Sequence, residues 1–252
     1  MKIDFPIPEQ IPELAALWQT AFGDTEEFID GFFFTGFSPA RCRCITIDNT
    51  ITAALYWFDI RHRGQRMAYI YAVATHPDHR GKGLCRQLME DTHAHLTLRG
   101  YRGAVLVPQN DGLRRMYAGM GYRDFGGISE FVCSAGTEPV QLHRIDREEY
   151  ASLRRRYLPE GGVIQEDENI CFLETMAFFY TGPHFLLAAA TEGQKLHSPE
   201  LLGDVSAAPG ILTALGCAEG TFRCPGDSMK FAMFRPLTID AATPAYFGLA
   251  FD

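Results

Sequence analysis

The chain has 252 residues, 46% of them hydrophobic and 21% charged, a composition typical of a globular protein with one large or two small domains. Its net charge of −8 argues against non-specific nucleic-acid binding, and no run reaches the ~18 apolar residues that a membrane helix needs. Seven cysteines without a C-x-x-C spacing, and a start without a basic stretch and apolar run, predict a cytoplasmic protein with reduced thiols and no metal site.

The first half of the chain begins with helical patterns and continues with extended ones. Apolar residues recur at helical spacing between Pro12 and Gly23, and Thr25 can cap a second helix that ends near Gly36. β-branched and aromatic runs then predict strands, and helical and extended patterns alternate after them. The expected elements are strands at 42–47, 52–60 and 67–75, a helix at 84–99, a strand at 104–107, a helix at 111–120 and a strand from 122 on.

The second half follows a small, polar, turn-rich linker at 134–139. Its expected elements are strands at 140–145, 184–191, 196–202, 229–234 and 246–251, and helices at 146–157, 166–179 and 209–215. This order resembles a second pass through the first half, which indicates a diverged structural repeat. In the helix expected at 146–157, the run Arg154-Arg155-Arg156 is expected on a solvated face.

The segment richest in chemistry joins the nearly all-apolar strand at 67–75 to the helix at 84–99. Gly81 and Gly83 allow a ligand to approach the backbone at the start of that helix, where unpaired N–H groups carry the positive end of the helix dipole. Three cations, Arg80, Lys82 and Arg86, stand where Asp and Glu are usual. The turn therefore predicts a pyrophosphate-sized anion site, against the alternative of a solvated basic turn.

The turn lacks the G-K-[ST] ending of a Walker loop and the third glycine of a dinucleotide-binding turn. The run Arg80-Gly81-Lys82-Gly83-Leu84-Cys85 instead resembles the R/Q-x-x-G-x-G/A pyrophosphate motif of the GNAT (GCN5-related N-acetyltransferase) superfamily, with Cys85 replacing the final Gly or Ala. Residues 110–122, NDGLRRMYAGMGY, resemble its second signature, a tyrosine four residues before a Gly-aromatic pair. The resemblance extends over about residues 1–133.

The resemblance implies an α/β fold whose first half is a GNAT domain, with a mixed, mostly antiparallel central sheet flanked by helices. We expect residues 1–135 to form the acetyl-CoA-binding domain and residues 140–252 a degenerate GNAT-like half without a cofactor motif. At the equivalent place in that half, Asp204 would repel phosphates. The arrangement is similar to tandem GNAT proteins, including the Eis-like aminoglycoside acetyltransferases.

The resemblance also implies roles for individual residues. Backbone groups of Val73, Ala74 and Thr75 would bind the pantetheine arm of acetyl-CoA, and Asn110 would contact the cofactor. Tyr117 would protonate the departing thiolate after direct attack of a primary amine on the thioester. The pyrophosphate would be held by the turn and first helical residues Arg80, Gly81, Lys82, Gly83, Leu84, Cys85 and Arg86.

Several questions stay open in the sequence. Many family members deprotonate the amine with a carboxylate on the fourth strand, but Met67–Ala74 contains none, which leaves Tyr69, Tyr71, Asp59, His62 or a residue of the second half. The phenylalanines between 28 and 37 are expected as a core stripe, with an aromatic acceptor pocket as the alternative. The acceptor is a small-molecule or peptide amine, and both monomer and homo-oligomer stay open. The rival functions are a non-catalytic acyl-CoA-binding or interaction module and transfer of a longer acyl group.

Overall fold

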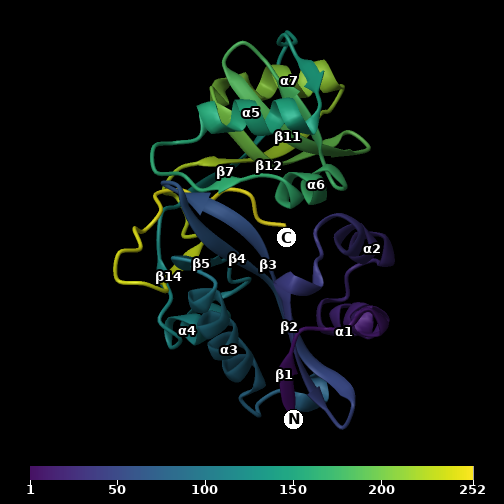
Figure 1. Cartoon of the computed structure of the whole chain (residues 1–252). Helices are drawn as coiled ribbons and strands as arrows, with labels where there is room; N and C mark the ends of the chain where they lie inside the picture. Colours follow the sequence, from purple (N-terminus) through teal and green to yellow (C-terminus); the bar gives the residue numbers. More distant parts are fainter. Residues whose placement is uncertain (252) are drawn as a thin grey trace. The chain divides into compact units, whose positions relative to one another are not determined.

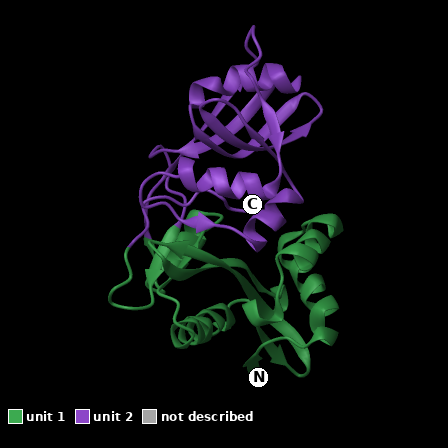
Figure 2. Ribbon diagram, turned by 45° about the horizontal axis from the view of Figure 1, so that its top comes forward, with its two compact units in different colours: residues 1–123, 233–242 green, residues 124–232, 243–252 purple. Residues whose placement is uncertain are grey.

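The computed structural model describes residues 1–251, which divide into two compact units that are each discontinuous in sequence (Figure 2). Unit 1 contains Met1–Arg123 and Met233–Ala242, and unit 2 contains residues 124–232 and 243–251. The division expected from the sequence, 1–135 and 140–252, differs from these units because it assumed two continuous stretches. No helix within residues 1–251 is long and apolar enough to cross a membrane.

Unit 1 is a mixed sheet with helices on both faces. Its strands lie in the order β1 (Lys2–Asp4), β2 (Cys42–Ile47), β3 (Thr50–His62), β4 (Gln65–Thr75), β5 (Gly103–Leu106) and β14 (Met233–Pro236), followed by β6 (Arg123–Asp124). The β4–β5 pair is parallel, and β1–β2, β2–β3, β3–β4 and β5–β14 are antiparallel. This mixed, mostly antiparallel sheet confirms the expected fold class.

The helices of unit 1 form two pairs on opposite faces of the sheet (Figure 1). On one face lie α1 (Ile11–Phe22) and α2 (Glu26–Thr35), where Trp18 packs against Tyr56 of β3. On the other lie α3 (Leu84–Leu98) and α4 (Asp111–Ala118), which share a core with alternate residues of β3 such as Trp57. Short 3-10 turns occur at Pro8–Gln10, Pro39–Arg41 and Pro77–His79.

Local sequence signals account for the ends of these elements. Gly23 ends α1 in the left-handed region at φ 77°, which costs a glycine little. The Thr25 hydroxyl accepts a 3.3 Å hydrogen bond from the Phe28 N–H and so caps α2 as expected. Asp48 and Asn49 adopt positive φ in the turn between β2 and β3. The predicted helices and strands of this half are therefore confirmed, with β1 as an addition.

Unit 2 is also a mixed sheet with helices. Its sheet order is β7 (Ile128–Ser134), β13 (Glu219–Pro225), β12 (Lys195–Gly203), β11 (Phe185–Glu192), β10 (Phe178–Thr181) and β8 (His143–Ile145). The remaining elements are α5 (Arg147–Tyr157), β9 (Ile164–Gln165), α6 (Glu168–Glu174), a 3-10 turn at Val205–Ala207 and α7 (Ala208–Leu215). Phe222, Leu187 and Leu201 lie at the centre of its core.

Three elements expected in the second half differ from the structure, and one strand was missed. The helix predicted at 166–179 ends at Glu174, because Phe178–Thr181 joins the sheet as β10. The segment predicted as a strand at 246–251 is irregular, because its carbonyls make separate hydrogen bonds rather than a strand ladder. The Tyr246 carbonyl accepts from the Val163 N–H, and the Leu249 carbonyl accepts from the Gln165 side chain. The strand predicted at 229–234 begins only at Met233, as β14. β13 was not predicted at all.

The two sheets have the same strand order, and the halves exchange one strand. In each unit five strands of one half lie side by side in chain order, with β9 left out of the second sheet. The last two of the five are parallel and joined by a helix, α3 in unit 1 and α7 in unit 2. The next position beside β5 is filled by β14, which follows β13 in the chain. The position beside β13 is filled by β7, which follows α4. The return of β14 to the first sheet explains why both units are discontinuous.

A fully buried ion pair contradicts the expectation that all three arginines at 154–156 are solvated. Arg154 is 1% exposed and donates two hydrogen bonds to Glu200, at 2.6 and 2.9 Å. The same carboxylate accepts from the Tyr150 hydroxyl at 3.0 Å and the Tyr246 hydroxyl at 3.2 Å. Because every oxygen is satisfied, the buried charge is tolerated and holds the 243–251 segment in unit 2.

We predict that Gly103→Ala lowers the free energy of unfolding by about 1–3 kcal/mol, because its Cβ would overlap the Phe234 ring of β14. Urea denaturation measures the loss. The double variant Gly103→Ala/Phe234→Leu should recover part of it, since the smaller side chain makes room. An unchanged stability of Gly103→Ala would show that β14 does not dock on β5 as described.

Candidate active site

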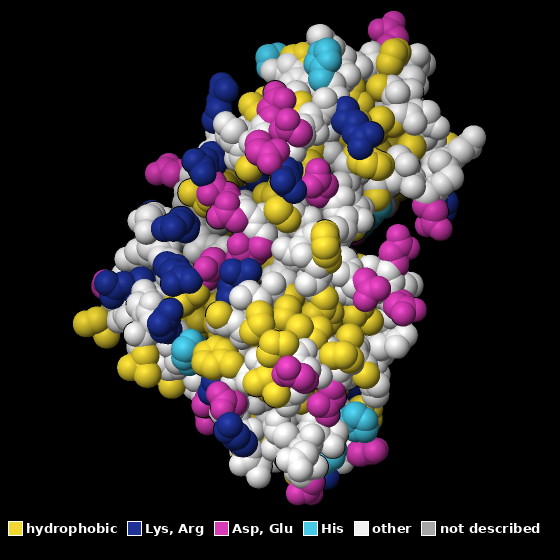
Figure 3. Space-filling model, turned by 45° about the vertical axis from the view of Figure 1, so that its right-hand side comes forward, with side chains coloured by type: hydrophobic (Ala, Val, Ile, Leu, Met, Phe, Trp, Pro, Cys, Tyr) yellow, Lys and Arg dark blue, Asp and Glu magenta, His cyan; other side chains and the backbone are white. Residues whose placement is uncertain are grey.

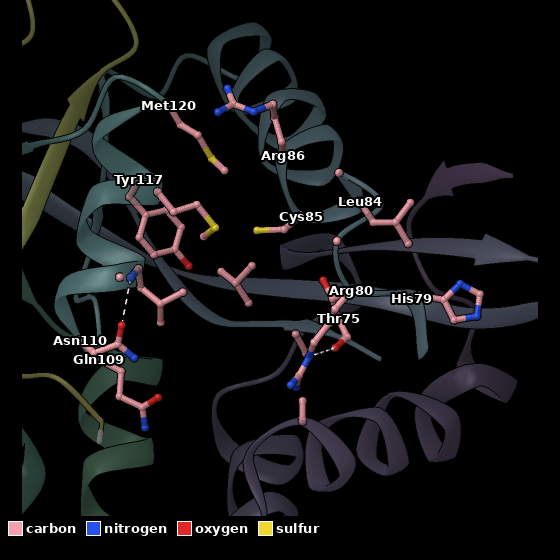
Figure 4. Close-up of a pocket in the computed structure, with 18 of the residues that line it drawn as sticks. Thr75, His79, Arg80, Leu84, Cys85, Arg86, Gln109, Asn110, Tyr117 and Met120 are labelled. Carbon is pink, nitrogen blue, oxygen red and sulfur yellow. Dashed lines mark hydrogen bonds between the residues drawn. The ribbon is translucent and has the colours of Figure 1, made fainter. Parts of the chain in front are cut away.

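A cavity of about 750 Å³ opens in unit 1 where β4 and β5 separate (Figure 4). Its walls come from the end of β4, the turn before α3, the first turn of α3, α4 and the last residues of α1. Of the site residues predicted from the sequence, all line it except Lys82: Val73, Ala74, Thr75, Arg80, Gly81, Gly83, Leu84, Cys85, Arg86, Asn110 and Tyr117.

The separation of the two strands begins early in β4. β4 pairs with β5 only from Met67 to Tyr69, although β4 continues to Thr75. On its other side, the register with β3 slips so that two residues, Ala72 and Val73, stand opposite one. Ala72 takes a positive φ of 45°, a strained value for a residue with a Cβ. The β5-facing edge of the strand after Tyr69 is thereby left without a partner strand among residues 1–251.

The glycine turn leaves the start of α3 free of internal hydrogen-bond partners. Gly81 and Gly83 have φ values of 73° and 77°, and nothing lies within 4 Å of the place where a Cβ of Gly81 would be. Gly83 is the N-cap of α3, so no side chain caps the helix, and its first turn contains no acidic residue. Unpaired N–H groups and the helix dipole therefore face an accessible space, which suits an anion.

The three cations of this segment are held in different ways. The Arg80 Nε donates to the Thr75 carbonyl at 3.2 Å, and the Lys82 Nζ donates to the Asp78 carbonyl at 2.8 Å. The Arg86 guanidinium instead reaches α4, donating to the Gly119 carbonyl at 3.3 Å. Arg80 and Lys82 thus remain beside the turn, whereas Arg86 joins the start of α3 to the end of α4.

α4 carries the two other predicted residues. The Asn110 Oδ1 caps this helix by accepting the Leu113 N–H at 3.0 Å, which leaves the Asn110 Nδ2 available to a ligand. Tyr117 is 6% exposed, and its hydroxyl points into the cavity from the α4 side (Figure 4). Burial, with a smaller contribution from Cys85, raises the pKa of Tyr117 well above its ordinary value. The side chain is therefore a neutral phenol at pH 7, able to donate a proton.

A buried cluster lies behind Tyr117. The Tyr122 ring contacts the Tyr117 ring edge-on with centroids 5.9 Å apart, and the Tyr122 hydroxyl shares a 2.7 Å hydrogen bond with the His93 Nε2. Burial, helped by the nearby charge of Arg235, lowers the pKa of His93 to about 3. Arg235, on β14, donates to the Met120 carbonyl just after α4. The position of Tyr117 thus depends on residues from α3 and from the end of the chain.

None of the four named candidates for the general base lines this cavity. Asp59 accepts hydrogen bonds from the Tyr101 hydroxyl and, at 2.7 Å, from Arg66. His62 is 1% exposed, and Tyr69 and Tyr71 belong to a cluster of aromatic rings on the α1 side of the sheet. The lining residues that sequence reasoning missed are Ala21, Phe22, His79, Gln109, Gly112, Leu113, Met116 and Met120. His79, Gln109 and Met116 directly adjoin the predicted residues Arg80, Asn110 and Tyr117. The four missed residues of α4 and its end also fall within the 110–122 signature, which would have been the signal to include them: Gly112, Leu113, Met116 and Met120.

Comparison with known proteins assigns the first half of the chain to a family. Residues 5–125 match the family model of the acetyltransferase (GNAT) domain. A search of curated proteins gives no match. Within the part of the chain that the structure describes, no group of three His, Cys, Asp or Glu side chains could hold a metal ion.

Solved structures resemble the whole chain in fold. A GCN5-related N-acetyltransferase from Anabaena variabilis is 16% identical with a TM-score of 0.73, covering 94% of this chain and 73% of that chain. Eis1 from Mycobacterium abscessus is 12% identical with a TM-score of 0.69, covering 94% and 74%. A putative acetyltransferase from Pyrococcus horikoshii is 13% identical with a TM-score of 0.65, covering 98% and 93%. At these identities the likeness shows the fold, and it extends over both units.

We predict a pH-dependent stability from His93. Because its folded pKa of about 3 lies below the ordinary value of 6.5, the unfolded chain binds one more proton between these values. The contribution of His93 titration to the free energy of unfolding is complete above pH 6.5. It falls by up to about 1.4 kcal/mol per pH unit as the pH drops toward 3.

Urea denaturation of wild type and His93→Gln across pH 4–7 measures this effect as the difference between the two profiles. The exposed His197→Gln is the matched control and should run parallel to wild type. Parallel profiles for His93→Gln as well would contradict the prediction.

Proposed function

The chain is a GNAT superfamily protein with its acetyltransferase domain at residues 5–125, and we propose that it transfers the acetyl group of acetyl-CoA to a primary amine. One observation carries this proposal. A single cavity combines an uncapped helix start beside two cations, a strand edge without a partner and a buried neutral phenol. These are the groups needed to bind a pyrophosphate, a pantetheine amide chain and a leaving thiolate.

Acetyl-CoA would extend through the cavity from the start of α3, along the free edge of β4, to Tyr117. N–H groups from Gly81 to Arg86 would hold the pyrophosphate, with Arg80 and Lys82 supplying opposite charge. The free edge of Val73, Ala74 and Thr75 would hydrogen-bond the two amides of the pantetheine arm, as a strand does with a neighbour. The Asn110 Nδ2 would donate to the same arm where β4 and β5 part. No metal is needed for any of these contacts.

The chemistry would be a direct transfer. The neutral amine attacks the thioester carbonyl carbon, so a C–N bond forms while the carbonyl oxygen takes the negative charge. The C–S bond then breaks, and the thiolate of coenzyme A takes the Tyr117 proton. The amine has lost one proton to solvent before attack. Its nitrogen loses a second proton as the amide forms, and this proton returns to the Tyr117 oxygen directly or through water, which balances the proton given to the thiolate.

We predict that the wild type binds acetyl-CoA with micromolar affinity in isothermal titration calorimetry. Arg80→Glu/Lys82→Glu should weaken binding at least tenfold, because two attractive charges at the pyrophosphate become repulsive. The control Arg61→Glu/Arg99→Glu changes the net charge of the protein by the same amount at two residues that do not line the cavity, and it should bind acetyl-CoA like wild type. A wild type that binds neither acetyl-CoA nor coenzyme A would overturn the proposed function.

We predict that Tyr117→Phe lowers kcat for acetyl transfer about 100-fold or more, because the thiolate then leaves without a proton donor. Acetyl-CoA affinity should stay within about twofold, since the ring remains. Tyr101→Phe removes a hydroxyl that does not line the cavity and should keep the wild-type rate. Tight acetyl-CoA binding without turnover of any amine would instead support the rival function, a non-catalytic acyl-CoA-binding module.

A further inference from the structure

The cavity contains a thiol close to Tyr117. Cys85 lies in the first turn of α3 and is the one cysteine among the residues that line the cavity. It is partly buried and packs against the core cluster that includes Tyr117. Figure 4 shows the Cys85 Sγ directed across the cavity toward the Tyr117 side chain on α4. This position of the turn therefore presents a reactive sulfur to whatever binds in the cavity.

The Tyr117 hydroxyl indicates where the sulfur of coenzyme A would lie. Tyr117 is 6% exposed, its hydroxyl points into the cavity, and it makes no hydrogen bond to another of residues 1–251. A buried hydroxyl without a partner is costly unless a ligand supplies one. In the proposed reaction the departing thiolate is that partner. The coenzyme A sulfur thus comes to the side chain that the Cys85 Sγ faces.

The charges beside Cys85 favour a reagent that carries phosphates. The protein has a net charge of −8, and Figure 3 shows acidic and basic side chains mixed over one face of it. An anionic reagent is therefore not attracted to the surface in general. At the start of α3, by contrast, Arg80, Lys82 and the uncapped N–H groups form a positive site, and the first turn contains no acidic side chain. A disulfide that bears a nucleotide is concentrated beside Cys85.

Burial protects Cys85 from reagents that do not bind in the cavity. Burial raises the pKa of the Cys85 thiol, with the charge of Arg86 opposing this effect, so little of the thiol is ionised at pH 7. Only the thiolate attacks a disulfide. A reagent that merely collides with the protein therefore reacts slowly, whereas a bound one keeps its sulfur beside Cys85 until the thiol ionises.

We propose that Cys85 is a covalent modification site, and that its ligand is coenzyme A disulfide, the oxidised form of the product. The inference rests on the coenzyme A binding of the proposed function. The Cys85 thiolate attacks the sulfur beside Tyr117, so an S–S bond forms between Cys85 and one coenzyme A. The S–S bond of the reagent breaks, and the second coenzyme A leaves as a thiolate that takes the proton Cys85 has lost. The exchange needs no further oxidant.

The adduct closes the active site reversibly. Its coenzyme A part occupies the glycine turn and the free edge of β4, so acetyl-CoA cannot bind. An added thiol attacks the mixed disulfide and restores Cys85 by the reverse exchange. Acetyl transfer therefore stops when coenzyme A is oxidised and resumes when it is reduced.

Incubation with coenzyme A disulfide, followed by intact-mass measurement, tests the site. The wild type should gain the mass of a coenzyme A, and dithiothreitol should remove it. Cys85→Ala should gain about tenfold less, because no bound thiol remains beside the reagent. Cys171→Ala removes a thiol of α6 that is also partly buried but does not line the cavity, and it should be labelled like wild type.

Peptide mapping of the labelled wild type locates the adduct without any variant and should place it on Cys85. The acetyl-transfer rate after treatment, relative to the same protein untreated, should fall with labelling in wild type and stay constant in Cys85→Ala. An adduct on another cysteine, or undiminished labelling of Cys85→Ala, would overturn the proposal.

Labelling rates test whether binding directs the reaction. Coenzyme A disulfide should label wild type about 100-fold faster than glutathione disulfide at the same concentration, since glutathione disulfide lacks the nucleotide that the turn binds. Arg80→Glu/Lys82→Glu should slow labelling about tenfold, and Arg61→Glu/Arg99→Glu should leave it unchanged. Equal rates for the two disulfides would contradict the proposal.

Calorimetry separates failure of this inference from failure of the proposed function. A wild type that binds acetyl-CoA but forms no adduct at Cys85 overturns the modification site and leaves acetyl transfer standing. A wild type that binds neither acetyl-CoA nor coenzyme A overturns the proposed function, and the modification site with it.

Discussion

The short parallel pairing of β4 with β5 is the constraint on which the site depends. The strands share three residue pairs, from Met67 to Tyr69, and the bulge at Ala72 then turns β4 away. A sheet that stayed paired to Thr75 would have no cavity and no free strand edge. Because β5 is only four residues long and gives up part of one edge, its other edge must be well paired, and β14 provides that pairing over all four residues.

The exchanged strand also fixes the helix that carries Tyr117. α4 has eight residues, too few to be stable by itself in water. Its first turn is capped by Asn110, and its C-terminal carbonyls bind two guanidinium groups, Arg86 from α3 at Gly119 and Arg235 from β14 at Met120. Cations at this end of a helix also stabilise its dipole. The last part of the chain thus contributes to the site through a strand and one arginine, without lining the cavity.

Local interactions explain which features the sequence could predict. Gly23, Thr25 and the glycines at 81 and 83 act through their own backbone or a neighbour's. The ends of α1 and α2 and the glycine turn before α3 therefore follow from short segments of sequence. Pairing between distant segments has no such signal. The sequence around Phe234 is compatible with a strand in the sheet of either half. Arg154 is distinguished from Arg155 only by its buried partner Glu200, which lies 46 positions further along the chain. The segment 246–251 was predicted as a strand because its apolar and aromatic residues are common both in strands and in buried irregular segments.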